Sequence, residues 1–359
     1  MVNDMNEKIL VAMSGGVDSA AAAILLKNNG FDVTGVTMKL YSQTEKITDF
    51  DAGDITKDIA DAMLLADKLN IPHRVIPFGD SFKCSVIDKF IADYKDGATP
   101  NPCVECNKRI KFGKLFDYAK ENSFDKLATG HYASVVQDTN GRYIIKKAKD
   151  QNKDQSYVLW SLTQDVLSSV ILPLGEFSKA EIREIVGSIC PENASKSDSQ
   201  DICFIPDGDY VKFIEQNTSD VFPKGKFVDI GGNVLGEHQG IIRYTVGQRK
   251  GLGIALGRPM FVKEKNVRDN TVTLCDNHEL FSKTLTAKSV NLIACDDLYS
   301  KARLTAKIRY KHGEALATVT QISDDRILVE FDEAQRAIAK GQSVVLYDGD
   351  TLVGGGIIE

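Results

Sequence analysis

The hexapeptide SGGVDS at residues 14–19 constrains the fold of this chain more than any other segment. It stands between the apolar run KILVAM (8–13) and a helix-like stretch (17–29), which gives the order strand, glycine-rich loop, helix. Two adjacent glycines let the backbone approach a phosphate chain, while the hydroxyls of Ser14 and Ser19 and the helix N-terminus supply donors and positive potential. A capped strand-to-helix turn is the alternative, but the full pattern directly after a strand favours a polyphosphate-binding loop. The loop is not of the Walker type, because no Gly-Lys-Ser/Thr follows it.

Asp18 is the only carboxylate within the hexapeptide. Magnesium bound to polyphosphate takes one or two carboxylates and fills its other positions with phosphate oxygens and water, so Asp18 is a candidate Mg²⁺ ligand. An acid in the first turn of a helix also interacts favourably with the helix dipole. The two roles are compatible.

The first half of the chain alternates strand-like and helix-like segments. Strands are expected at 8–13, 31–38, 73–78 and 126–129, and helices at 17–29, 55–69, 82–94 and 106–121. Gly30 can end the first helix in the left-handed conformation. This order predicts a doubly wound parallel sheet with helices on both faces.

The second half changes to β-structure. Asn140-Gly141 predicts a hairpin, Ser178 and Glu181 form a capping box, 191–199 reads as a polar loop, and 210–216 reads as a helix. Turn signals at 231–232, 269–270 and 324–325 then separate short alternating strands, among them 301–310. This pattern is typical of small sandwiches or barrels, and we place domain boundaries near 209 and 284.

Length and composition indicate a globular protein outside the membrane. The chain has 359 residues, of which 43% are hydrophobic, so two or three domains are expected. No run of about eighteen apolar residues occurs, and the start MVNDMNEKILVAM lacks the basic-then-apolar order of a secretory signal. We therefore expect a cytoplasmic protein with no membrane partner.

Basic residues are unevenly distributed. The formal net charge of −6 argues against indiscriminate binding to polyanions. Two stretches nevertheless hold basic residues without an acid among them: Lys108, Arg109, Lys111 and Lys114, and then Lys301, Arg303, Lys307, Arg309 and Lys311. Such stripes can hold a phosphate backbone locally, although a solvated face or strand edge is the simpler explanation of either stripe alone.

Seven scattered cysteines, an odd number, fit reduced thiols better than a disulfide framework. Cys103 and Cys106 form a CxxC pair behind two prolines, and Cys106 is expected to open a helix whose amides favour a thiolate. A structural zinc site is the alternative, but no second pair of ligands lies nearby in sequence. Cys203 stands in the polar segment 198–204 and is expected to be accessible. The other four are assigned to buried packing: Cys84, Cys190, Cys275 and Cys295.

These segments together resemble the bacterial tRNA 2-thiouridylase family (MnmA/TrmU), and loop 14–19 resembles the SGGxDS loop of the ATP pyrophosphatases. The matching segments are 12–20, 36–39 (VTMK), 99–102, 106–107, 110–112, 127–132 (LATGHY), 153–159 (KDQSYVL), 199–204 (SQDICF), 244–254 (YTVGQRKGLGI) and 309–310. The resemblance therefore covers the whole chain. It implies a doubly wound ATP-pyrophosphatase domain of the adenine nucleotide alpha hydrolase type (1–209), a small β-rich central domain (210–283) and a C-terminal β-barrel (284–359).

The resemblance also implies an activity, the ATP-dependent thiolation of position 2 of the wobble uridine in tRNAs for Lys, Glu and Gln. With Mg²⁺, ATP would adenylate the 2-carbonyl oxygen and release pyrophosphate, and a cysteine-borne sulfur would displace AMP. Both steps are needed, because a urea-like carbonyl is a poor electrophile and its oxygen a poor leaving group. The base would leave the anticodon stack to react. The sulfur would come from a cysteine desulfurase, a relay protein or free sulfide.

Site residues follow from the family's motifs by position. Cys203 would carry the persulfide, with Cys106 as its partner thiol. The nucleotide would be lined by Ala12, Met13, Ser14, Gly15, Gly16, Val17, Asp18, Ser19, Met38 and Gly130. The tRNA would be contacted by Lys153, Asp154, Gln155, Gln248, Arg249, Lys250, Arg309 and Tyr310, and its target base by Asn101, Pro102 and Cys103.

Cys103 departs from the family pattern, since many members carry an Asp there that is the proposed acid/base group. With this extra thiol, Cys103, Cys106 and Cys203 could ligate three irons of a 4Fe–4S cluster whose open iron activates sulfide, by analogy with other tRNA thiolases. The alternative is a persulfide relay between Cys203 and Cys106, with Cys103 a bystander or a resolving thiol. A zinc ion on the same sulfurs would be purely structural.

Two other functions account for parts of the sequence. An ATP pyrophosphatase acting on a small molecule, as in amide- and guanidine-forming synthetases, explains the loop but gives no use for the cysteines or the β-rich third. A tRNA-binding protein with a vestigial nucleotide loop explains the basic stripes but not the intact loop. Release of AMP and pyrophosphate, measured with and without RNA, separates the three.

Overall fold

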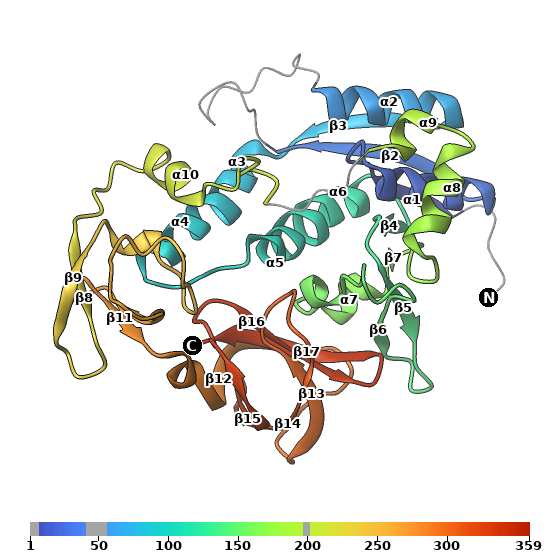
Figure 1. Cartoon of the computed structure of the whole chain (residues 1–359). Coiled ribbons are helices and arrows are strands. Elements are labelled where there is room, and N and C mark those ends of the chain that lie inside the picture. The colour runs from blue at the N-terminus through green and yellow to red at the C-terminus, as the bar shows by residue number, and fades with distance from the viewer. Residues whose placement is uncertain (1–6, 41–55, 197–201) are drawn as a thin grey trace. The chain divides into compact units, whose positions relative to one another are not determined.

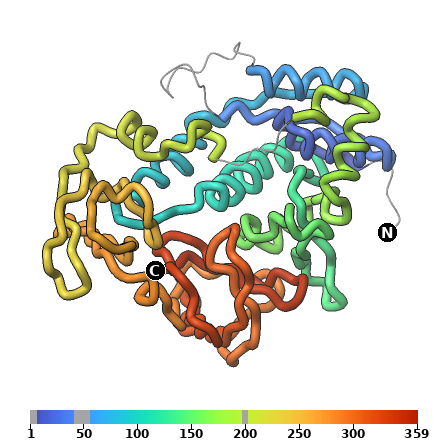
Figure 2. The backbone as a smooth tube through the Cα atoms, viewed as in Figure 1, coloured from blue at the N-terminus to red at the C-terminus, as the bar shows by residue number. Residues whose placement is uncertain are grey.

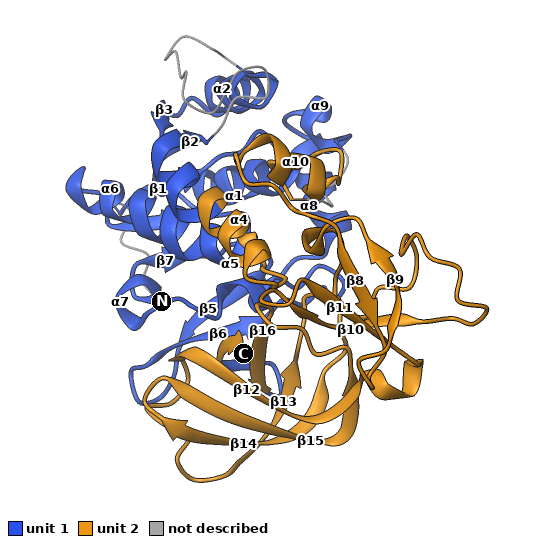
Figure 3. Cartoon of the chain, turned by 90° about the vertical axis from the view of Figure 1, so that its left-hand side faces the viewer, with its two compact units in different colours: residues 1–86, 103–200, 348–353 blue, residues 87–102, 201–347, 354–359 orange. Residues whose placement is uncertain are grey.

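The computed structural model describes residues 7–40, 56–196 and 202–359. The chain divides into two compact units, which Figure 3 shows in different colours. The first unit holds residues 1–86, 103–200 and 348–353, and the second holds 87–102, 201–347 and 354–359.

A five-stranded parallel sheet forms the core of the first unit, in the order β3-β2-β1-β4-β7 (Figure 1). Its strands are β1 (Lys8–Ala12), β2 (Asp32–Lys39), β3 (His73–Pro77), β4 (Lys126–Ala128) and β7 (Val170–Ile171). The chain winds outward from β1 to β3 and then returns to the other side of β1 with β4, a path that can be followed in Figure 2. Ligands of open parallel sheets bind beyond the carboxyl ends of the strands at such a reversal.

Helices of the first unit lie between and after these strands along the chain. They are α1 (Val17–Asn28), α2 (Lys57–Leu69), α3 (Gly79–Phe82), α5 (Pro102–Cys106), α6 (Leu115–Glu121), α7 (Gln164–Leu167), α8 (Lys179–Gly187) and α9 (Pro191–Ala194), with a 3-10 turn at Ser156–Leu159. The alanines at 20–23 on α1 are all buried, so their small side chains let this helix lie close to its neighbours. Gly30, with φ +86°, ends the helix as expected, and the capping box of Ser178 and Glu181 opens α8.

Three helical expectations need correction. The helix expected from residue 106 begins at Pro102, and it runs through α5, a π-helical stretch (Asn107–Lys114) and α6. The expected helix at 82–94 consists of α3, a second π-helical turn (Lys83–Ile87) and α4 (Asp88–Lys95). Part of the expected loop at 191–199 is α9, because Pro191 at its start provides a φ already suited to a helix.

A β-hairpin interrupts the first unit as Asn140-Gly141 predicted. It joins β5 (Ala133–Gln137) to β6 (Tyr143–Lys147), and Gly141 adopts φ +84° in the turn. Strand β6 pairs with Thr351 and Leu352 near the end of the chain.

The second unit contains a helical segment, a small mixed sheet and a barrel. Its helices are α4 and α10 (Tyr210–Gln216), with 3-10 turns at Ile241–Arg243 and Asn277–Leu280. The small sheet has the order β10-β11-β8-β9 and is formed by β8 (Gly225–Val228), β9 (Val234–His238), β10 (Phe261–Asn266) and β11 (Thr271–Cys275). The turns at 231–232 and 269–270 connect its strands, as expected.

The barrel is formed by β12 (Phe281–Leu292), β13 (Ala302–Lys307), β14 (Ala315–Ser323), β15 (Arg326–Arg336), β16 (Ser343–Asp348) and β17 (Thr351–Ile358). The strands follow the order β12-β15-β14-β13-β16-β17, and pairing of Ala287 with Ile358 closes the cylinder. Strand β13 is shorter than the expected 301–310, so Arg309 and Tyr310 lie in the turn beyond it.

The expected fold class is therefore confirmed: an N-terminal doubly wound parallel sheet, a small β-rich region and a C-terminal closed barrel. Across the described ranges, none of the helices has the length and apolarity that crossing a bilayer requires.

Candidate functional site

The loop 14–19 lies at the carboxyl end of β1 and is held by its own polar groups. The Ser19 hydroxyl donates to the Gly16 carbonyl at 3.1 Å and accepts from the Ser14 amide at 3.0 Å. Gly15 has φ +73°, and a Cβ there would lie 2.3 Å from the Asp58 carbonyl oxygen, so a larger residue does not fit. The first backbone bond of α1 runs from the Ala20 amide to the Gly16 carbonyl, so the amides of residues 17–19 have no partner within the helix and can face an anion.

Gly130 brings the end of β4 against the same loop. A Cβ on Gly130 would lie 2.6 Å from the Asp18 carbonyl carbon and 2.7 Å from the Ser19 amide nitrogen, so this approach requires glycine. On the other side, the Thr37 hydroxyl of β2 donates to the Met13 carbonyl at 2.8 Å, and Met38 follows it. The structure thus gathers the ten expected nucleotide-lining residues at the carboxyl ends of β1, β2 and β4.

Asp18 is anchored by two donors. Its Oδ1 accepts the Tyr132 hydroxyl at 2.8 Å and the Lys179 ammonium at 2.7 Å. The Lys179 side chain is only 11% exposed, so it needs this carboxylate to compensate its charge. No contact from the described residues reaches the second oxygen of Asp18. One carboxylate oxygen beside a phosphate loop fits a magnesium ion that takes its other ligands from phosphate and water.

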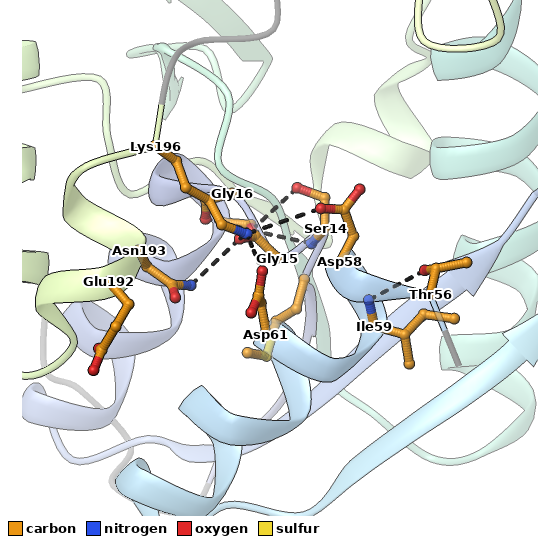
Figure 4. Close-up of polar contacts among 12 residues, drawn as sticks. Ser14, Gly15, Gly16, Thr56, Asp58, Ile59, Asp61, Glu192, Asn193 and Lys196 are labelled. Carbon is orange, nitrogen blue, oxygen red and sulfur yellow. Dashed lines mark hydrogen bonds and ion pairs between the residues drawn. The ribbon is translucent and has the colours of Figure 1, made fainter. Parts of the chain in front are cut away.

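The Gly15 carbonyl is held from the other side of the loop (Figure 4). It accepts the Lys196 ammonium at 2.7 Å and the Asn193 amide at 3.3 Å. Lys196 also pairs with Asp61, and its nitrogen lies 3.8 Å from an Asp58 oxygen. Four side chains that the sequence analysis did not assign to the site therefore hold the loop in place. They are Tyr132, Lys179, Asn193 and Lys196.

Cys103 and Cys106 both lie in α5, at the start of the helix that begins at Pro102. Cys106 is the last residue of α5 and is buried, and burial raises its pKa to about 11 although Lys111 opposes the shift. Cys103 reaches the surface, yet the protein around its thiol raises its pKa as well. The expected thiolate at Cys106 is therefore wrong for the resting protein, because desolvation outweighs the neighbouring positive charge.

Cys203 lies in the second unit and is exposed, as expected. The next residue, Phe204, is buried against Phe90 and Phe213, with ring centroids 5.5 Å and 5.1 Å away. This cluster anchors the chain directly after the thiol. The preceding residues 198–201 of the expected polar segment lie outside the described residues.

The other cysteines divide in two. Cys190 and Cys275 are buried as expected, but Cys84 is exposed on the π-helical turn and Cys295 is half-buried, so the assignment of these last two to the core is wrong. Exposure alone therefore does not distinguish Cys203 from a cysteine without a predicted role, such as Cys84. Among the residues that the structure places, no three Cys, His, Asp or Glu side chains gather into a group that could hold a metal ion. The expected iron-sulfur or zinc ligation by Cys103, Cys106 and Cys203 is therefore not shown.

The expected tRNA contacts of the first unit are largely engaged within the protein. Asp154 is buried and accepts bonds from the Ala148 amide at 3.1 Å and the Ser156 hydroxyl at 2.7 Å. Gln155 accepts the Tyr132 amide at 3.0 Å. Asp154 and Gln155 therefore shape their own loop, whereas the neighbouring Lys153 is partly exposed.

In the second unit, the segment 248–250 forms a basic turn. Gln248 accepts the Thr245 amide at 2.9 Å and donates to the Lys250 carbonyl at 3.0 Å, which leaves Arg249 and Lys250 exposed. A cavity of about 300 Å³ opens beside this turn. Its lining includes Arg249, Leu252, Arg258 and Met260.

The basic stripe of the barrel is less uniform than its sequence indicates. Arg303 forms two bonds to Asp332, at 2.8 Å and 2.7 Å, so its charge is already paired. Arg309 and Tyr310 lie beyond the strand and are half-buried. Asn101 and Pro102, expected at the target base, stand at the start of α5.

A parallel sheet with a glycine-rich, anion-ready loop at its reversal point, followed by two β-rich regions, defines a nucleotide-binding protein of the HUP class. Family models match in the same order: the tRNA methyl transferase HUP domain over residues 7–207, the tRNA methyl transferase PRC-barrel domain over 211–276 and the aminomethyltransferase beta-barrel domain over 282–358.

Curated relatives extend over the whole chain. The tRNA-specific 2-thiouridylase MnmA of Clostridioides difficile is 48% identical over 357 residues, 99% of each chain. MnmA 2 of Clostridium tetani is 47% identical over 359 residues, 100% of each chain, and MnmA of Acetivibrio thermocellus is 47% identical over 98% of this chain and 99% of its own. The chain therefore belongs to the tRNA-specific 2-thiouridylase MnmA family.

Two solved structures match part of this chain at low similarity. A 4-thiouridine synthetase in complex with RNA and bound ATP is 19% identical, with 59% of this chain and 50% of that chain covered and a TM-score of 0.34. The NMN synthetase of Francisella tularensis is 18% identical, with 54% and 66% covered and a TM-score of 0.32.

Proposed function

We propose that this chain is an ATP-dependent tRNA-uridine 2-sulfurtransferase, which thiolates position 2 of the wobble uridine in tRNAs for Lys, Glu and Gln. Membership of the MnmA family supports the reaction class and the tRNA substrate. The observation that carries the ATP-dependent step is the anion-ready loop 14–19, closed by Gly130 and placed at the reversal of the parallel sheet. We place the enzyme in the cytoplasm and in three domains, divided near 209 and 284.

The loop residues bind the phosphates and the reaction begins there. The 2-carbonyl oxygen of the uridine attacks the α-phosphorus of ATP, and pyrophosphate leaves with its charge facing the amides of the first turn of α1. Asp18 provides a carboxylate oxygen for Mg²⁺, which neutralises charge on the phosphates when it is bound. The uridine is now linked through oxygen to AMP, which is a good leaving group.

Sulfur transfer then uses Cys203 and Cys106. A donor, whether a cysteine desulfurase, a relay protein or free sulfide with an oxidant, leaves a persulfide on exposed Cys203. Its terminal sulfur attacks C2 of the base, and AMP departs with the former carbonyl oxygen. Cys106, after losing its proton, attacks the Cys203 sulfur, which releases 2-thiouridine and forms a Cys106–Cys203 disulfide. A thiol reductant restores both thiols.

The tRNA contacts are proposed where basic side chains reach the surface. Arg249 and Lys250 at the edge of the second-unit cavity can pair with phosphates, as can Arg309 beyond β13. Lys153 offers a further charge in the first unit. Asn101, Pro102 and Cys103 at the start of α5 are proposed to meet the flipped base.

One experiment separates this function from its two rivals. The protein is incubated with ATP and unmodified tRNA, and AMP, pyrophosphate and 2-thiouridine are measured with and without RNA. We expect tRNA-dependent release of AMP and pyrophosphate. Release without RNA in the presence of a small acceptor indicates a small-molecule synthetase, and tRNA binding without any release indicates a vestigial loop.

A 4Fe–4S cluster on Cys103, Cys106 and Cys203 is the alternative to the relay. Purification under nitrogen decides between them. A brown protein with about four irons per chain would replace the relay by the cluster. A colourless, iron-free protein that thiolates tRNA at full rate in air, also as Cys103→Ala, supports the relay.

A further inference from the structure

Lys196 and Asn193 both bind a backbone carbonyl of the phosphate loop rather than any part of the phosphate site itself. Their nitrogens lie 2.7 Å and 3.3 Å from the Gly15 oxygen (Figure 4). Asn193 is 1% exposed and the Lys196 side chain is 23% exposed, so both bonds are sheltered from water. Sheltered bonds of this kind hold their acceptor more firmly than exposed ones do.

The position of this carbonyl decides where the next amide points. In a trans peptide the C=O and the following N–H point in opposite directions, so fixing the Gly15 oxygen toward Lys196 directs the Gly16 N–H to the opposite side of the loop. A glycine with φ +73°, followed by another glycine, has little intrinsic preference for one orientation of this peptide. The orientation must therefore be imposed by other residues.

Charge and hydrogen bonding keep the two donors in place. Lys196 pairs with Asp61, which is itself only 22% exposed, and lies near Asp58, so its ammonium is neutralised while it points at the carbonyl. The Cys190 thiol lies 3.4 Å from Asn193 Oδ1, an arrangement that leaves Asn193 Nδ2 to face Gly15. The two donors thus form a supported clamp, defined here as Lys196, Asn193 and Asp61.

We propose that Lys196 is a positioning residue for ATP, which acts by turning the Gly16 N–H toward the phosphates and not by touching them. Asn193 shares this task and Asp61 holds Lys196 in place. The inference rests on the proposed binding of ATP by loop 14–19. It adds a polar clamp that stands outside the phosphate loop and belongs to a part of the sequence almost 180 residues away.

The test measures the affinity of the full-length protein for a non-hydrolysable ATP analogue with Mg²⁺ by calorimetry. We expect Lys196→Met to weaken binding about 10- to 100-fold, as loss of a charged hydrogen bond to a sheltered partner does. Lys196→Arg keeps a cationic donor and should restore the affinity to within about threefold. Affinity for tRNA and the thermal unfolding midpoint should change little in either variant.

Lys120→Met is the matched control. Lys120 also forms an ion pair in the first unit, with Asp165 at 2.9 Å, but it makes no bond to the loop or to the clamp. Its removal should leave nucleotide affinity unchanged. Wild-type affinity in folded Lys196→Met would overturn the proposal, and should that variant not fold, Asn193→Ala decides in the same way. Failure of the unaltered protein to bind the analogue would instead overturn the proposed function, and the inference with it.

Asp61→Asn distinguishes positioning from direct contact. If Asp61 only holds Lys196 against Gly15, its loss should loosen the clamp and weaken analogue binding several-fold. A lysine that grasps phosphate itself would gain charge from the loss of its carboxylate partner, and binding would strengthen. The latter outcome would overturn the positioning role.

Discussion

The phosphate loop and the Cys103–Cys106 helix belong to the same unit, but opposite physical effects set their chemistry. Charged groups in and beside the loop are paired: Asp18 of the loop with Lys179, and Lys196 with Asp61 outside it. The thiol of Cys106 is instead buried, no carboxylate or ammonium of the described residues bonds to it, and burial raises its pKa to about 11. The loop is therefore prepared for its charged ligand in advance, whereas the thiol is protonated at rest.

In the proposed mechanism, this difference keeps the adenylation step and the sulfur-transfer step from interfering. Under the proposed function, an anion site whose donors are already in place can bind ATP without rearrangement. A protonated Cys106 cannot attack persulfides or oxidants until a base or a conformational change removes its proton. Adenylation is thus expected to precede the release of sulfur.

The largest effects are expected from substitutions that each abolish one product of the reaction. Ser14→Ala removes a hydroxyl of the loop and should reduce pyrophosphate release at least about 100-fold while tRNA still binds, since RNA affinity resides in distant cationic surface. Cys203→Ser should keep pyrophosphate release and make no detectable 2-thiouridine. Filter binding, pyrophosphate assay and mass spectrometry of the nucleosides provide the readouts.

Cys84→Ser is the control for this separation, because Cys84 is also an exposed thiol. It should make 2-thiouridine at the normal rate. Full product from Cys203→Ser would refute its role as sulfur carrier, and normal pyrophosphate release from Ser14→Ala would refute the role of the loop.

The second prediction concerns the protonated state of Cys106. Since burial raises its pKa to about 11, alkylation of Cys106 should accelerate about tenfold per pH unit between pH 7 and 9, the range in which the thiolate is the minor species. Lys111 lowers this pKa, so Lys111→Met should slow alkylation further, whereas Lys108→Met should not. Peptide mass spectrometry after timed iodoacetamide treatment measures the rates. A pH-independent rate would show that Cys106 is already a thiolate.

The sequence predicted the features of the fold that local patterns encode. The strand, loop and first helix, the capping box of Ser178 and Glu181 and the helix Tyr210–Gln216 all depend on neighbouring residues, and all are present. The partners of the loop were missed, because Lys179 and Asp18 are separated by 161 residues and no local signal links them. The state of Cys106 was predicted wrongly, since the sequence shows its basic neighbours but not its burial.

A third prediction compares two arginines at expected tRNA contacts with Arg303, which is paired with Asp332. Arg249→Ala and Arg309→Ala should each weaken tRNA binding several-fold and reduce the slope of log affinity against log salt by roughly 1. Arg303→Ala should leave the slope nearly unchanged, since Asp332 already neutralises this arginine at 2.7 Å. Fluorescence anisotropy over a salt series measures the slopes. Equal slopes for all three variants and the parent protein would show that Arg249 and Arg309 do not contact tRNA phosphates.

The smallest effect is expected at Lys265, a lysine of the second unit that is desolvated like Cys106 but carries a charge. Its nitrogen lies 3.4 Å from the Ala98 carbonyl and 5.7 Å from the centre of the Tyr94 ring, and burial together with repulsion from Lys340 lowers its pKa to about 8. Because the unfolded chain binds this proton more tightly than the folded chain, stability should rise with pH between about 8 and 10.5. Lys265→Met should therefore stabilise the protein by about 1 kcal/mol at pH 7, after loss of the carbonyl and ring contacts, and this advantage should shrink toward pH 10.

Thermal unfolding of Lys265→Met, the parent protein and the exposed-lysine control Lys226→Met over this pH range tests the prediction. A destabilised Lys265→Met at pH 7 would mean that the ring and carbonyl compensate the buried charge in full, and that desolvation governs the thiol of Cys106 but not this ammonium.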